Sequence, residues 1–92
     1  MHKIDWPSLL GRTFETVKGA RFTVVRVTRG YVTIRPEKGT RDYALSIPDE
    51  LERVLATCPA GPLFPGPAEL PRLGVRPVLT SYVWGVAHAV ME

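Results

Sequence analysis

Side chains that could act as a nucleophile, a base or a metal ligand are few and far apart in this chain. Cys58 is the only cysteine, and the two histidines are His2 and His88. Cysteine catalysis needs a base beside the sulfur, and a zinc site needs ligands at short, regular spacings. Neither pattern occurs, and no phosphate-binding loop is present. We therefore expect a protein that is not an enzyme and that uses no metal or other cofactor.

Positive charge is concentrated in one segment. Eight of the twelve Lys and Arg residues lie between Gly11 and Arg41, together with only two acidic residues, so this segment carries +6 and the rest of the chain −3. Charge segregated in this way gives information about binding partners rather than about the fold. It favours binding of a nucleic acid or another polyanion. The chain has no Asn or Gln, the side chains that recognise adenine, so contacts are expected with phosphates or from Arg to guanine.

The same segment has the residue pattern of an antiparallel sheet. Three short turn signals, Lys18-Gly19, Arg29-Gly30 and residues 36–39, separate runs rich in β-branched and aromatic residues. Short turns join antiparallel neighbours, so the runs predict a four-stranded meander. The four predicted strands are 13–17, 22–28, 31–35 and 42–47.

Strand register follows from the turn lengths. A two-residue turn at Arg29-Gly30 pairs Val27 with Val32 and Val25 with Ile34, which places four aliphatic residues on one face. The next turn aligns Ile34 with Tyr43 and Val32 with Leu45 on that same face. Phe22 and Val24 break the alternation, which predicts a bulge near Val24-Val25 and a sheet that curls toward a barrel.

The opposite face of this sheet is the candidate binding surface. It would present outward-pointing cations and one aromatic ring, as small barrels do toward single-stranded nucleic acid. The alternative is an ordinary solvated strand face, in which Arg35 pairs with Asp42. The candidate nucleic-acid or polyanion contacts are Arg21, Arg26, Arg29, Tyr31, Thr33 and Arg35.

Two helices are predicted after the sheet. Ser46 and Asp49 have the spacing of a helix start, and apolar residues at helical spacing continue to Cys58. Residues 59–77 are rich in proline and predict an arm with at most one helical turn, around 68–73 and ended by Gly74. A second helix is expected in residues 78–92, with Thr80 as its N-cap.

The C-terminal helix is apolar nearly all round, which is unusual for a surface helix. One stripe, including Val83 and Val86, is expected to dock on the sheet. The other stripe predicts either a homodimer or partner interface, or a surface covered by the proline arm through residues 62–65. The interface candidates in that second stripe are Ser81, Trp84, Gly85 and His88.

These elements predict one small α+β domain. It would consist of an N-terminal turn (1–11) begun by Asp5, a curled antiparallel sheet (12–47), a helix (48–58), the proline arm (59–77) and the apolar helix (78–92). We expect a cytoplasmic protein, because no apolar run is long enough to cross a membrane and the N-terminus does not resemble a signal peptide. Loss of Asn and Gln, with nine prolines, is typical of thermophilic proteins.

Overall fold

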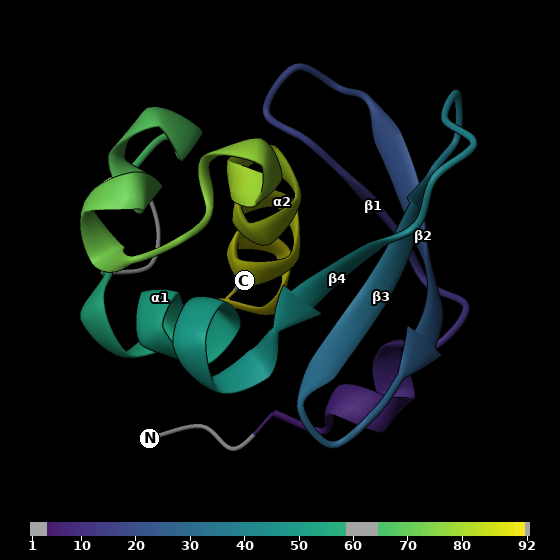
Figure 1. Ribbon diagram of the computed structural model, residues 1–92, viewed down its shortest axis with the longest axis horizontal. Coiled ribbons are helices and arrows are strands. Elements are labelled where there is room, and N and C mark those ends of the chain that lie inside the picture. Colours follow the sequence, from purple (N-terminus) through teal and green to yellow (C-terminus); the bar gives the residue numbers. More distant parts are fainter. Residues whose placement is uncertain (1–3, 59–64, 92) are drawn as a thin grey trace.

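The computed structural model describes residues 4–58 and 65–91 (Figure 1). Its sheet has four antiparallel strands in chain order: β1 (Thr13–Glu15), β2 (Arg21–Val27), β3 (Tyr31–Pro36) and β4 (Tyr43–Ser46). One short helical turn precedes the sheet and the other helices follow it. The predicted α+β meander is confirmed. The sheet is curled, but β1 and β4 do not pair, so it is not a closed barrel.

The register agrees with the predicted one across β3 and β4, where Ile34 lies opposite Tyr43 and Val32 opposite Leu45. Between β2 and β3 the ladder shifts by one residue, and Val24 rather than Val25 lies opposite Ile34. The predicted pairing of Val25 with Ile34 is therefore wrong, although the predicted bulge is present at this place. The extra residue turns Val24 inward, because the core favours burying Phe22 and Val24 together.

Short helices fill the rest of the described chain. The end of β4 runs into a π-helix, η2 (Ile47–Leu51), which continues as α1 (Glu52–Thr57). Ser46 accepts a hydrogen bond from the Asp49 amide, so the predicted start of this helix is confirmed. The remaining helices are η1 (Trp6–Leu9), η4 (Pro67–Leu73), η5 (Pro77–Leu79) and α2 (Thr80–Met91).

Two of the predicted caps differ in the structure. Thr80 is itself helical and its hydroxyl donates to the Pro77 carbonyl, because η5 leads directly into α2 without a break. Asp5 precedes η1, but its side chain makes no capping hydrogen bond. Gly74 ends η4 with a φ of 92°, a left-handed conformation that favours glycine, as the sequence predicts. Residues 59–64 of the proline arm lie outside the described residues.

Helices α1 and α2 lie on one side of the sheet, with η4 packed against both (Figure 1). The core between the layers contains the predicted Val32, Ile34, Leu45 and Leu51, all of them fully buried. Val27 is only half-buried at the edge of this core. The opposite face of the sheet is not covered by α1, α2 or η4, and we call it the outer face. Within the described residues, no helix is long and apolar enough to span a membrane.

Helix α2 docks on the sheet more closely than its sequence indicates. Val83, Val86 and Ala87 are fully buried, as predicted for the docking stripe. Gly85 is buried as well, because a Cβ atom there would lie 2.6 Å from the Glu15 carbonyl oxygen and 2.9 Å from the ring of Phe22. The close approach that Gly85 permits is made by the chain's own β1 and β2, through Glu15 and Phe22.

Candidate nucleic-acid interface

The outer face carries the polar side chains that alternate with the buried residues of each strand. Thr13 and Glu15 of β1 lie opposite Thr23 and Arg21 of β2, and the Thr13 and Thr23 hydroxyls are 3.1 Å apart. Arg26 lies opposite Thr33 of β3. The residues of this face are Thr13, Glu15, Arg21, Thr23, Arg26, Tyr31, Thr33, Arg35 and Ala44.

Two of the three arginines on the outer face are paired with acids. The Arg35 guanidinium donates two hydrogen bonds to Asp42, at 2.7 and 3.1 Å, as the sequence predicts. These bonds lower the pKa of Asp42 and raise the pKa of Arg35. Arg21 lies 3.7 Å from Glu15, with both side chains more than half exposed. Both pairs reduce the net charge that the outer face offers to an anion.

The side chain of Arg26 makes neither a hydrogen bond nor an ion pair with a described residue. It is exposed, and its charge contributes to the lowered pKa of Asp42, so its field reaches the Arg35 pair. Tyr31, the first residue of β3, is 49% exposed. Arg29 lies in the turn between β2 and β3, near Tyr31. The structure thus brings Arg26, Thr33 and Arg35 together, and places Arg21 and Arg29 toward opposite ends of the sheet.

An open cleft lies at the end of the sheet where the β1–β2 and β3–β4 turns meet the start of α2. Its volume is about 720 Å³. The two turns contribute Lys18 and Lys38, and α2 contributes Ser81 and Tyr82. Ser81, which the sequence groups with Trp84, therefore lines a different surface. Val78, which is 75% exposed, forms part of the rim.

Trp84 and His88 stack on each other one turn apart on α2, with ring centroids 4.6 Å apart. Both are partly buried, and they line a shallow groove of about 340 Å³ beside β1. The Trp84 indole N–H donates to the Pro65 carbonyl oxygen at 2.9 Å. Pro65 is the first described residue of the arm after the gap, so one residue of the predicted arm does contact Trp84. Residues 62–64, also predicted to cover it, lie outside the described residues.

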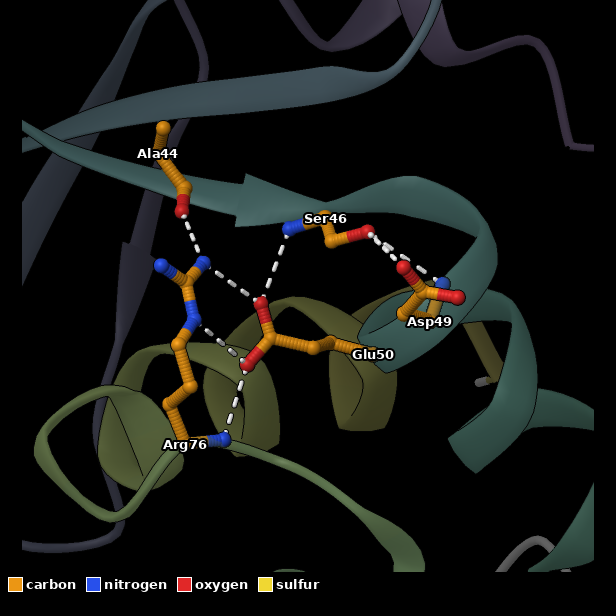
Figure 2. A network of polar contacts seen from close by, with 5 residues as sticks. All are labelled: Ala44, Ser46, Asp49, Glu50 and Arg76. Atoms are coloured by element: carbon orange, nitrogen blue, oxygen red, sulfur yellow. Dashed lines mark hydrogen bonds and ion pairs between the residues drawn. The ribbon is translucent and has the colours of Figure 1, made fainter.

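Sequence reasoning missed the most extensively bonded side chain, the carboxylate of Glu50 (Figure 2). Its side chain is 2% exposed, and it accepts hydrogen bonds from the Ser46 amide and from the amide and guanidinium of Arg76. The Arg76 guanidinium also donates to the Ala44 carbonyl. Burial alone would raise the pKa of Glu50, but the hydrogen bonds outweigh it and the net shift is downward. This network fastens the segment before η5 to the end of β4.

The catalytic and metal-binding candidates are not brought together. Cys58 is buried in the core, and burial raises the pKa of its thiol, which makes it a poor nucleophile. His88 stacks on Trp84, and His2 lies outside the described residues. Residues 4–58 and 65–91 contain no cluster of acidic, histidine or cysteine side chains that could hold a metal ion. Comparisons with protein-family models, curated proteins and solved structures found no match to this chain.

Proposed function

We propose that this protein is a small non-enzymatic binder of single-stranded nucleic acid or a similar polyanion, and that it binds through the outer face of its sheet. One observation carries the proposal. The segment from Gly11 to Arg41 holds +6 of charge, and it forms β1, β2, β3 and their turns, whose outer face is left open by α1, α2 and η4. An uncovered sheet with cations and an exposed ring suits a flexible charged strand.

The ion pairs of the outer face define how such binding would work. Two hydrogen bonds to Asp42 fix the orientation of the Arg35 guanidinium and partly neutralise its charge. Arg26, which keeps no hydrogen bond to a described residue, would contact a phosphate directly. Thr33 and Tyr31 beside them supply a hydroxyl and a ring. We therefore expect weak binding without sequence preference that decreases steeply as salt concentration rises.

Fluorescence anisotropy with a labelled single-stranded oligonucleotide at low salt tests the proposal. Changing both Arg26 and Arg35 to Ser should weaken binding and make the slope of log affinity against log salt shallower by about 0.7 to 1.4, the values for one and two lost phosphate contacts. Arg72→Ser is the matched control, because Arg72 is 84% exposed on η4, away from the outer face. Absence of binding by the wild type, or equal binding by the double variant, would refute the proposal.

A second candidate function is a protein-interaction module, in its simplest form a homodimer, built on α2. The observation that favours it is the groove beside β1, in which the stacked Trp84 and His88 form one wall. Partly exposed aromatic residues are concentrated at interfaces. Gly85 also lines this groove, but it is buried against β1 and Phe22, so Trp84 and His88 would supply most of the helix contacts.

A further inference from the structure

The cleft at the end of the sheet contains several polar groups that the fold leaves unused. Lys18 and Lys38 make no hydrogen bond or ion pair with any described residue, and they come from two different turns. Arg21 also lines the cleft, and Glu37 is the one acidic residue among the lining residues, which gives them a net formal charge of +2. Arg21 is engaged by Glu15, whereas the two lysines are free to bind an anion.

Hydroxyl groups face the same space. The rings of Tyr43 and Tyr82 stack with their centroids 5.2 Å apart, and both line the cleft. Neither phenol hydrogen-bonds to a described residue, and no buried side-chain oxygen of the described chain lacks a partner, so both hydroxyls reach solvent. Burial, and then the proximity of Tyr43, raise the pKa of Tyr82, which keeps its hydroxyl protonated and able to donate. The Ser81 hydroxyl lies beside them on α2.

The position of these donors is fixed by the core rather than by loops alone. Tyr82 packs edge to face on the buried Phe22, with ring centroids 5.3 Å apart, while it stacks on Tyr43. Two phenols held in place by ring packing and two lysines therefore line the same cleft. Phosphate fits such a site better than carboxylate, because it has three terminal oxygens and close to two negative charges. Lysine is a common phosphate ligand that acts as a point charge.

We propose that this cleft binds a phosphomonoester, with Lys18 and Lys38 neutralising its charge and Tyr43, Ser81 and Tyr82 donating hydrogen bonds to its oxygens. The group could be carried by a free mononucleotide or by the terminal phosphate of a nucleic-acid strand. The cleft lies at the end of the sheet rather than on its outer face. Arg21, which is paired with Glu15, borders both surfaces. The proposed ligands of the cleft are not outer-face residues, so each site can fail without the other.

Titration of adenosine monophosphate, with adenosine as the neutral control, tests the inference by amide shifts in nuclear magnetic resonance spectra. The nucleotide should shift the amides of residues 16–21, 37–39 and 78–82, and adenosine should not. Changing both Lys18 and Lys38 to Ser should weaken binding at least about tenfold. Tyr82→Phe removes only the hydroxyl and leaves the ring packing in place, and it should weaken binding severalfold. Arg72→Ser, on η4 and outside the cleft, is the control and should bind like the wild type.

Oligonucleotides with and without a 5′ phosphate separate the two sources of the group. Tighter binding of the phosphorylated strand than of the unphosphorylated one, lost when Lys18 and Lys38 are changed, assigns the site to a chain end. Equal binding of the two strands, together with binding of adenosine monophosphate, assigns it to a free nucleotide. Equal shifts with adenosine and its monophosphate would overturn the inference, as would wild-type affinity in both the lysine and the Tyr82 variants. Binding of unphosphorylated strands that depends on Arg26 but not on Lys18 or Lys38 would support both proposals, because these strands carry no terminal phosphate for the cleft.

Discussion

Glu50 shows how the role of one residue can depend on a distant part of the chain. In the sequence it is an acid in the first turn of a predicted helix, a position where acids are common and usually exposed. In the structure it is nearly fully buried, because Arg76, 26 residues later, donates both backbone and side-chain hydrogen bonds to it. Nothing in the local pattern distinguishes Glu50 from Asp49, which is exposed. The residue's importance could not be predicted without the tertiary contact.

We expect Glu50→Gln to lower the free energy of unfolding by about 2 to 3 kcal/mol, because it weakens the hydrogen bonds to a buried carboxylate and removes its charge. The matched control is Glu69→Gln, whose ion pair with Arg72 is exposed and should be worth less than about 1 kcal/mol. Urea unfolding at neutral pH measures both changes. Equal losses in the two variants would contradict the structural role of the network.

The dependence on pH gives the same prediction an independent check. The pKa of Glu50 is lower in the folded chain than its ordinary value of 4.5. The stabilisation it provides is therefore complete above about pH 4.5 and is lost as the pH decreases through the folded-state pKa. Urea unfolding between pH 6 and pH 3 should show a smaller loss of stability for Glu50→Gln than for the wild type, because the variant has no carboxylate to protonate there.

Among the elements, the strands were the most predictable and the C-terminal helix the least. Alternation in the sheet is strict enough to reveal the strands, and its single violation at Phe22 and Val24 revealed the bulge. The predicted pairing of Val25 with Ile34 is wrong because the length of the turn does not show at which residue the bulge interrupts the ladder. Helix α2 is apolar on almost every side, so its sequence cannot show that Gly85 belongs to the buried side.

We predict that Gly85→Ala destabilises the protein by about 1 to 3 kcal/mol, although alanine is the better helix former. The added Cβ would meet the backbone oxygen of Glu15, which cannot move aside as a flexible side chain could. Gly30→Ala is the control, because a Cβ there would meet nothing within 4 Å and its φ is not positive. Thermal unfolding compares the two. A stabilised Gly85→Ala variant would show that α2 is not docked on β1 as described.

At the scale of the whole molecule, the sequence predicted the segregation of charge but not its arrangement. The cations of the segment 11–41 include an outer-face group around Arg26 and a cleft group around Lys18 and Lys38. The others are separate: Arg12 lies over the Phe14 ring, and Arg29 and Arg41 lie in turns. Alternation predicts which side of a strand a residue occupies. It does not predict that two turns from opposite edges of the sheet meet α2 to form a cleft, because that depends on where the helix docks.

The homodimer candidate makes a prediction about the intact protein. If Trp84 and His88 pack against a second copy, light scattering at ~100 μM should give the mass of a dimer, a concentration that populates even a micromolar complex. Trp84→Glu should then give a folded monomer, because a buried charge at the interface is costly. Circular dichroism confirms that the variant is folded. A monomeric wild type at this concentration would eliminate the dimer.

Strand β4 is at an edge of the sheet, and side chains cover its outer side. The Glu50 and Arg76 side chains occupy the Ser46 amide and the Ala44 carbonyl on the side of β4 that faces away from β3, so they take the place of a fifth strand. Unpaired backbone N–H and C=O groups along a sheet edge are a template for aggregation. The Glu50 and Arg76 side chains therefore protect this edge from pairing, as a covering loop or an edge lysine does in other sheets. Acid that protonates Glu50 would weaken its hold on the Ser46 amide and on Arg76, and would make this edge of β4 more open to pairing with β-strands of other molecules.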